Sequence, residues 1–324
     1  MRILVTGGAG YIGSITNTLL REKGFETIVF DNLSCGHREA VGDTKLIVGD
    51  LTDENAIDRI FLEQPIDAVI HFAAKALAGE SMEKPHEYYT NNIVGGLNLL
   101  DAMQKHGCTT LVFSSTCAVY GTPVKLPVSE DALIHPESVY ASSKHMFEEI
   151  LDWYETIYGI HSIKLRYFNA SGAILDGSLG EDHSPETHII PIAMEVASGK
   201  RPQFEMFGED YDTPDGTCIR DYIHVVDLAD AHIKALDNLR KTHASNVFNL
   251  GVGRGYSNRE VINAVEKITG KKLNVTVGPR RPGDPAQIYA DNTKAKQTLG
   301  WEPKYSELET IVGSAWKWHQ RIRY

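Results

Sequence analysis

The sequence predicts an α/β protein with a doubly wound parallel (Rossmann) sheet and a smaller C-terminal α/β domain. An apolar run at residues 3–6 ends in a glycine-rich turn at residues 7–13, and a helical stretch follows. This is the strand–turn–helix order of a dinucleotide-binding unit. Further apolar runs alternate with helical stretches, as a parallel sheet with crossover helices requires. After residue 169 long loops rich in Gly, Asp, His, Ser and Pro indicate a second domain.

The alternation predicts the strands and the domain limits. The first domain covers residues 1–168, a segment near 215–250 rejoins it, and residues 169–324 form the second domain. Predicted strands are residues 3–6, 27–30, 45–48, 68–72, 110–113, 163–166 and 246–250. Predicted helices of the second part are residues 192–198, 226–239 and 257–269, and its long loops are 172–191, 208–216 and 278–285.

The glycine turn indicates a dinucleotide site. Gly7, Gly10 and Gly13 let a pyrophosphate approach the N–H groups at the helix start. The second strand ends at Asp31, about 20 residues further on, where a carboxylate accepts from an adenosine ribose and repels a 2′-phosphate. The pattern therefore predicts NAD rather than NADP. The alternative is a tight turn and a surface aspartate.

Polar and small residues follow the other predicted strands. Because ligands bind at the carboxyl ends of parallel strands, these residues are candidates for the site. They are Asp50-Leu51, Phe72-Ala73-Ala74, Ser114-Ser115-Thr116 and Tyr167-Phe168-Asn169. For residues 114–116 the alternative is hydroxyl groups that cap a turn.

Tyr140 and Lys144 are one helical turn apart, so they share a face. A phenol with a pKa near 10 is about one part in a thousand ionised at pH 7. A nearby ammonium stabilises the phenolate, and the tyrosine then serves as a general acid or base. The alternative is an ordinary amphipathic helix, because Phe147, Ile150 and Leu151 supply an apolar face.

Charge and cysteine usage exclude several classes of partner. The net charge of −11 argues against nucleic acid and anionic membranes, so an anionic substrate needs a local cluster, for which Arg220 and the pair Arg280-Arg281 are candidates. The four cysteines lack metal-ligand spacing, so no metal site or disulfide is expected and a reducing cytoplasm fits. The first residues are already strand-like and no apolar run is long enough to span a membrane, so neither a signal peptide nor a membrane anchor is expected.

Five segments together carry a resemblance to a known family. They are residues 7–14 (GGAGYIGS), 113–121 (FSSTCAVYG), 166–169 (RYFN), 216–225 (GTCIRDYIHV) and 280–284 (RRPGD). With Tyr140 and Lys144 they resemble the extended short-chain dehydrogenase/reductase family, and most closely its UDP-glucose 4-epimerases. The likeness runs nearly end to end. It implies NAD in the N-terminal part, a UDP-sugar in the C-terminal part, a cytoplasmic enzyme of galactose metabolism and a homodimer.

The resemblance also implies roles for individual residues. Tyr140 would be the acid/base, Lys144 its activator and a ribose ligand, and Thr116 the hydroxyl that bonds the sugar's 4-oxygen. Cofactor contacts would come from Gly7, Gly10, Tyr11, Ile12, Gly13, Asp31, Asn32, Asp50, Leu51, Phe72, Ala73, Ala74, Asn91, Ser114, Tyr140, Lys144 and Tyr167. Substrate contacts would come from Thr116, Tyr140, Asn169, Arg220, Arg281, Asp284 and Ile288. The chain departs from some epimerases at Ala76, where they carry a lysine, and the adjacent Lys75 is expected to point elsewhere.

The expected reaction is epimerisation at C4 of a UDP-hexose through a 4-keto intermediate. Alternatives are an epimerase for UDP-pentoses, UDP-uronates or N-acetylhexosamines, a nucleotide-sugar dehydratase or decarboxylase, and a non-catalytic dinucleotide sensor. Dehydratases of similar fold carry an Asp-Glu pair where this chain has Cys117-Ala118. The residue at the position of Ile288 is expected to influence whether N-acetylated sugars are accepted, and the alternative for Ile288 is a strand residue that faces the core.

Overall fold

The computed structural model describes residues 1–281 and 284–321. The chain divides into two compact units, each assembled from three segments. Unit 1 comprises Met1–Gly121, Ile134–Arg166 and Ala229–Phe248, and unit 2 comprises Thr122–Leu133, Tyr167–Leu228 and Asn249–Tyr324. The short segment Thr122–Leu133 lies within the range predicted for the first domain, but its contacts place it in unit 2.

A seven-stranded sheet in the order β11-β6-β5-β4-β1-β2-β3 forms the centre of unit 1. Its strands are β1 (Arg2–Thr6), β2 (Glu26–Asp31), β3 (Lys45–Val48), β4 (Ala68–His71), β5 (Thr110–Thr116), β6 (His161–Tyr167) and β11 (Asn246–Leu250). β1 runs parallel to both β2 and β4, so the strand order reverses beside β1. The predicted doubly wound fold is confirmed, and each of its strands matches a predicted apolar run.

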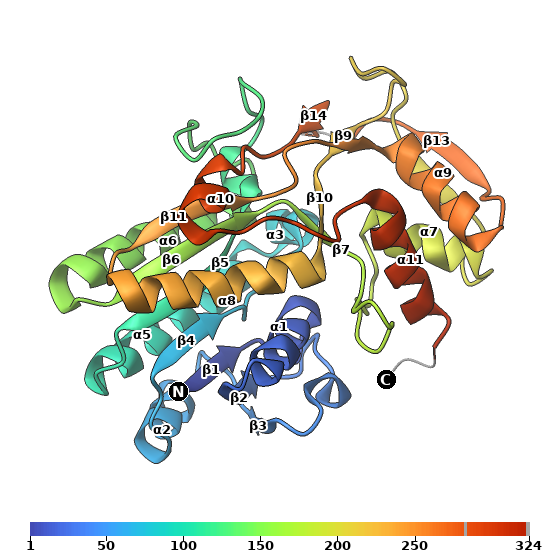
Figure 1. Cartoon of the computed structure of the whole chain (residues 1–324). Coiled ribbons are helices and arrows are strands. Elements are labelled where there is room, and N and C mark those ends of the chain that lie inside the picture. The colour runs from blue at the N-terminus through green and yellow to red at the C-terminus, as the bar shows by residue number, and fades with distance from the viewer. Residues whose placement is uncertain (282–283, 322–324) are drawn as a thin grey trace. The chain divides into compact units, whose positions relative to one another are not determined.

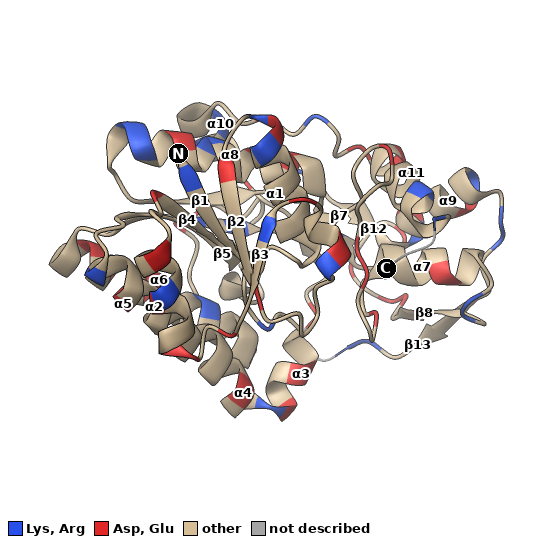
Figure 2. Cartoon of the chain, turned by 90° about the horizontal axis from the view of Figure 1, so that it is seen from below, with Lys and Arg blue, Asp and Glu red and all other residues tan. Residues whose placement is uncertain are grey.

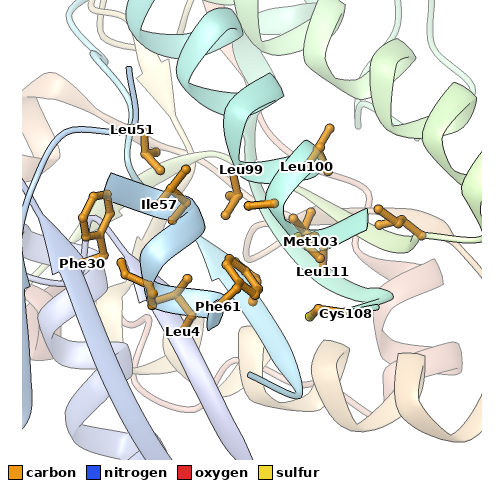
Figure 3. Close-up of a cluster of buried hydrophobic side chains, with 14 of the residues drawn as sticks. Leu4, Phe30, Leu51, Ile57, Phe61, Leu99, Leu100, Met103, Cys108 and Leu111 are labelled. Carbon is orange, nitrogen blue, oxygen red and sulfur yellow. The ribbon is translucent and has the colours of Figure 1, made fainter. Parts of the chain in front are cut away.

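Helices cover both faces of this sheet. They are α1 (Tyr11–Glu22), α2 (Glu54–Glu63), α3 (Ala78–Glu83), α4 (Pro85–Tyr89), α5 (Gly95–Lys105), α6 (Val139–Tyr158) and α8 (Val225–Thr242), with the short elements η1 (Arg38–Val41), η2 (Thr90–Val94) and η3 (Cys117–Tyr120). Figure 1 shows α1 and α8 on one side of the strands. On the other face the apolar residues of α2, α5 and α6 pack on the strands, and Figure 3 shows Leu4, Phe30, Ile57, Phe61 and Met103 converging there.

Charged residues are absent from the interior of β1, β4 and β5, whereas β6 carries Lys164 and Arg166. In β1 and β2 they lie at the ends, at Arg2, Glu26 and Asp31, and Figure 2 shows most of the others on helices and loops. Buried parallel strands have this composition because neither face meets water. None of the helices in the described part of the chain is long and apolar enough to cross a membrane.

Unit 2 consists of short strands and a group of helices. Its strands are β7 (Asn169–Ser171), β8 (Phe204–Phe207), β9 (Ile219–Arg220), β10 (Tyr222–His224), β12 (Tyr256–Ser257), β13 (Val275–Gly278) and β14 (Gln287–Ile288). They form the small sheets β10-β7, β12-β9-β14 and β13-β8. The helices are α7 (Ile189–Ala197), α9 (Asn258–Thr269), α10 (Thr293–Leu299) and α11 (Leu308–His319). Apolar faces of α7, α9 and α11 form the core with β8.

Candidate functional site

The glycine turn after β1 forms a closely packed cradle in unit 1. Gly7 has φ +72°, and a Cβ added there would lie 2.5 Å from the backbone nitrogen of Ala73. A Cβ on Gly13 would lie 2.2 Å from the carbonyl oxygen of Gly7. α1 then begins at Tyr11, and the first N–H groups of a helix point out of its N-terminal end. These N–H groups, on Tyr11, Ile12 and Gly13, fit the pyrophosphate of a dinucleotide.

The end of β2 supplies the carboxylate that the sequence predicts. Asp31 is buried, and its two oxygens accept from the backbone nitrogens of Ala9 at 2.9 Å and Leu33 at 2.8 Å. It is therefore fixed beside the glycine turn with lone pairs left for a ribose hydroxyl. Asn32 donates to Asp50 at 2.8 Å. Burial alone would raise the pKa of Asp50, but hydrogen bonds from Asn32 and Thr52 hold it below its usual value.

The segment after β4 lies beside the same turn. Phe72 and Ala73 approach Gly7, and their backbone nitrogens both donate to the carbonyl of Thr6. The side chain of Leu51, a predicted cofactor contact, is part of the hydrophobic core and does not lie on the surface. Any contact of Leu51 with a ligand would therefore come from its backbone.

Asn91 lies in η2, a single π-helical turn, and its side-chain oxygen accepts from the backbone nitrogen of Lys75 at 3.1 Å. Its neighbour Asn92 bonds both backbone groups of Lys75 and donates to Ser143. The sequence analysis missed Asn92, although the Asn-Asn pair before a glycine-rich helix was a possible signal. The side chain of Lys75 pairs with Glu87 at 2.8 Å, so it points away, as expected.

Thr116, Tyr140 and Lys144 belong to two neighbouring elements of unit 1. Thr116 ends β5, and Tyr140 and Lys144 lie in the first turns of α6, which Ser138 caps through the backbone nitrogen of Ala141. A hydrogen bond joins the side chains of Thr116 and Tyr140. Lys144 is buried, and its ammonium donates to the carbonyl of Ser114 at 2.7 Å. The predicted hydroxyl, phenol and ammonium therefore come together.

Burial dominates the ionisation of this group. It raises the pKa of Tyr140 to about 12, although the bond with Thr116 lowers it, and it lowers the pKa of Lys144 to about 7, although the charge of Glu148 raises it. The direction for Tyr140 is opposite to the sequence-based expectation, because removal of the phenol from water disfavours its charged form. Burial therefore disfavours the phenolate, which needs the positive charge of Lys144 to form.

A cavity of about 260 Å³ in unit 2 gathers the predicted diphosphate residues. Asn169, Arg220, Arg281 and Asp284 all line it, together with Phe207. Arg220 donates to Asp284 at 3.2 Å, and the guanidinium of Arg281 lies 4.0 Å from the ring centroid of Phe207. Two guanidinium groups in one cavity suit a phosphate ester. Pro282 and Gly283 of the same motif lie outside the described residues.

Three predicted residues stand apart from this cavity. Arg280 is bonded to Asp210 and lies over the ring of Tyr211. Ile288 is 7% exposed and does not line the cavity; on β14 it pairs in register with Arg220. Tyr167 is buried at the end of β6. The proposed influence of Ile288 on the choice of sugar stays a prediction.

A second charged cluster borders the cavity and was not predicted. Glu181 accepts from His183 at 3.1 Å and from His188 at 2.8 Å, and Glu186 accepts from His188 at 3.0 Å. Burial opposes the charge of the imidazoles, but the two carboxylates raise the pKa of both histidines. The ligand atoms of these four residues lie within 4.8 Å of one another, a spacing that also suits a metal ion. The repeated Glu-x-His pair was the available sequence signal.

Comparisons with known proteins agree with this geometry. Residues 3–251 match the model of the NAD dependent epimerase/dehydratase family. The chain is similar to the UDP-glucose 4-epimerase of Halalkalibacterium halodurans, with 50% identity over 99% of this chain and 96% of the relative.

Solved structures are similar over the same length. The UDP-glucose 4-epimerase of Brucella ovis in complex with NAD superposes with a TM-score of 0.96 and 45% identity, covering 99% of each chain. The enzyme of Bifidobacterium longum in complex with NAD+ and UDP has a TM-score of 0.93 and 41% identity over 98% of each chain. The chain therefore belongs to the NAD dependent epimerase/dehydratase family, and within it to the UDP-glucose 4-epimerases.

Proposed function

We propose that the protein interconverts UDP-glucose and UDP-galactose by epimerisation at C4 with tightly bound NAD. The observation that carries this function is the hydroxyl–phenol–ammonium group of Thr116, Tyr140 and Lys144, in the unit that also holds the glycine cradle and Asp31. Unit 1 is accordingly the NAD-binding domain. Unit 2, with Arg220 and Arg281 in one cavity, is the UDP-sugar-binding domain.

Each residue of the catalytic group has a distinct task. The phenolate of Tyr140 accepts the proton of the sugar's 4-hydroxyl, and the resulting phenol returns it to the 4-oxygen of the product, which Thr116 also bonds. The positive charge of Lys144 stabilises the phenolate while the proton is away from it. Bound NAD would supply a hydride acceptor that is regenerated in each cycle. The 4-keto sugar would turn in the site between the two proton transfers and so present its opposite face.

The residues next to Thr116 favour epimerisation over elimination of water. A dehydratase needs an acid/base pair close to the sugar, and Cys117 and Ala118 stand at those positions. The methyl group of Ala118 cannot transfer a proton, so the acid/base pair of a dehydratase is incomplete here. A dinucleotide sensor without activity is also disfavoured, because both Tyr140 and Lys144 are present and buried together.

The proposed function is tested with the protein as purified. Mass spectrometry after denaturation should find NAD, and UDP-galactose should be converted into UDP-glucose without added cofactor. A panel of UDP-pentoses, UDP-uronates and UDP-N-acetylhexosamines measures the preference. A 4-keto-6-deoxy product would instead identify a dehydratase, and a protein with neither NAD nor conversion of any sugar would contradict the proposal.

Replacement of Arg220 by glutamine should raise KM for the UDP-sugar about tenfold or more and change kcat little. The guanidinium faces a phosphate that is unchanged in the reaction, so its contribution is nearly uniform binding. Calorimetry with UDP should show the same loss of affinity. Arg280→Gln is the matched control, because Arg280 pairs with Asp210 outside the cavity. Equal UDP affinity in wild type and Arg220→Gln would remove Arg220 from the substrate site.

We further propose a homodimer in the cytoplasm. Met146, Trp153 and Ile157 form an exposed apolar stripe on one face of α6, which we call the α6 face, and Trp153 is 65% exposed. A contiguous apolar stripe on a helix is typical of a protein interface. None of the four cysteines forms a disulfide, which suits a reducing compartment.

Trp153→Asp should therefore convert a dimer into a monomer in light-scattering measurements. Leu62→Asp is the control, since Leu62 is 73% exposed but lies on α2, outside the α6 face. A wild-type protein that is monomeric at micromolar concentration would contradict the dimer.

A further inference from the structure

Glu148 is a buried carboxylate that the proposed chemistry does not use. It lies on α6 one turn beyond Lys144, and each of the two residues is 3% exposed. Residues four apart share one face of a helix. Tyr140, Lys144 and Glu148 therefore follow one another along a single line on α6.

The carboxylate is held by two neighbouring strands. Arg166, at the end of β6, donates from Nε to Oε1 at 2.9 Å and from a terminal nitrogen to Oε2 at 2.5 Å. The hydroxyl of Ser115 on β5 donates to Oε1 at 2.5 Å. Burial raises the pKa of Glu148, but the charge and hydrogen bonds of Arg166 and the hydrogen bonds of His145 and Ser115 hold it at about 2. Glu148 is therefore charged over the working range of pH.

Helix α6 forms hydrogen bonds with two consecutive residues at the end of β5. Lys144 donates to the carbonyl of Ser114, and Glu148 accepts from the side chain of Ser115. The next residue along the strand is Thr116. Two hydrogen bonds therefore connect the strand residues just before Thr116 to the helix that carries Tyr140.

The charges around Lys144 indicate a second role for Glu148. Its own helix presents Tyr140 and Glu148, β4 presents His71, and β6 presents Arg166. Burial keeps the pKa of His71 at about 3, so this ring is neutral, and the charge of Arg166 is engaged by Glu148. The negative charge that raises the pKa of Lys144 against the effect of burial comes from Glu148.

We propose that Glu148 is a positioning residue, which keeps Thr116 in register with Tyr140 and supplies the counter-charge of Lys144. This inference deepens the proposed function and rests on it. It adds to the reaction a residue that touches neither sugar nor cofactor and acts through Ser115 and Lys144.

The test uses the double variant Glu148→Gln/Arg166→Met of the purified holoenzyme, because removal of both charges avoids leaving one of them buried alone. Its thermal midpoint should stay close to that of wild type. Its kcat should fall at least about tenfold with KM nearly unchanged, since only the geometry of the reacting groups is altered. Glu149→Gln is the matched control, because Glu149 is the neighbour on α6 and is exposed.

A second measurement is independent of activity. Nitrogen-15 NMR follows the titration of the Lys144 ammonium, assigned by its disappearance in Lys144→Met, and the midpoint should fall by about one pH unit in the double variant. A purely structural role would leave this midpoint unmoved.

The outcomes separate the two proposals. A stable double variant with wild-type kcat and an unchanged Lys144 midpoint overturns the role of Glu148. If the double variant does not fold, Ser115→Ala, which retains both charges, should still lower kcat several-fold without a shift of that midpoint, and wild-type kcat would overturn the role. A wild-type protein without epimerase activity rejects the proposed function, and the titration still decides whether Glu148 is the counter-charge.

Discussion

Tyr140→Phe is expected to lower kcat by about 10²–10⁴-fold, the usual contribution of a single general acid/base. Phenylalanine keeps the ring on α6 but removes the group that accepts the 4-hydroxyl proton. The hydroxyl of Thr116 remains, and its ordinary pKa is far too high for the same task. UDP affinity should change little, because Asn169, Arg220 and Arg281 lie in unit 2. Steady-state assays of UDP-galactose conversion measure kcat, and calorimetry with UDP measures the affinity.

The control for this variant is Tyr154→Phe. Tyr154 lies on the same helix, and its hydroxyl donates to Asp101 at 2.5 Å, away from Thr116. This variant should retain turnover within about twofold, since it removes only a surface hydrogen bond. If Tyr140→Phe kept a comparable rate, Tyr140 would not be the acid/base.

Arg166→Met is expected to reduce the free energy of unfolding by about 3–5 kcal/mol, because it leaves Glu148 buried without its cation. Arg166 is itself buried and also donates to the hydroxyl of Tyr120 at 2.9 Å. Urea unfolding followed by circular dichroism measures the change. Arg254→Met is the control: Arg254 pairs with Glu307 at the surface, where such pairs contribute about 1 kcal/mol or less.

The pH dependence of this loss has a definite sign. In the wild type the pKa of Glu148 is depressed from 4.5 to about 2, so the stabilisation is present above pH 4.5 and is lost as pH falls toward 2. Without Arg166, burial raises the pKa of Glu148. Protonation of Glu148 then removes the unpaired buried charge that destabilises the variant. The difference between variant and wild type should therefore shrink from pH 7 to pH 4. A constant difference would mean that lost packing, rather than the unpaired charge, destabilises the variant.

Much of the fold follows from local patterns in the sequence. β3 and β11 begin and end where the apolar runs do, and α9 differs from its predicted range by one residue. Short strands such as β9 and β14 have two residues each and carry no periodicity, so only their pairing partners define them. The same holds for Thr122–Leu133, whose membership of unit 2 depends on contacts such as Val128 with Tyr289.

Only part of the site could be predicted from the sequence, and the reason is similar. Glycines, Asp31 and the Tyr140–Lys144 pair have fixed spacing along the chain, so a single sequence reveals them. Glu148, Ser115 and Arg166 come from three elements, and their partnership exists only after β5, β6 and α6 have packed. The pKa of Tyr140 could not be inferred from Lys144 alone, because its largest influence is burial, which is a tertiary property.

The division of unit 1 into three separate stretches has a consequence for synthesis on the ribosome. Strand β6 has β11 as its outer neighbour, and β11 is completed only at residue 250 of 324. Until that point has left the exit tunnel, the nascent sheet has six strands and β6 is an open edge with unpaired backbone groups. Such an edge pairs readily with another strand, so chaperone occupancy and aggregation of stalled chains should be highest between the emergence of β6 and the emergence of β11 from the tunnel. Fragments that end before β11 are therefore poor candidates for a minimal cofactor-binding domain.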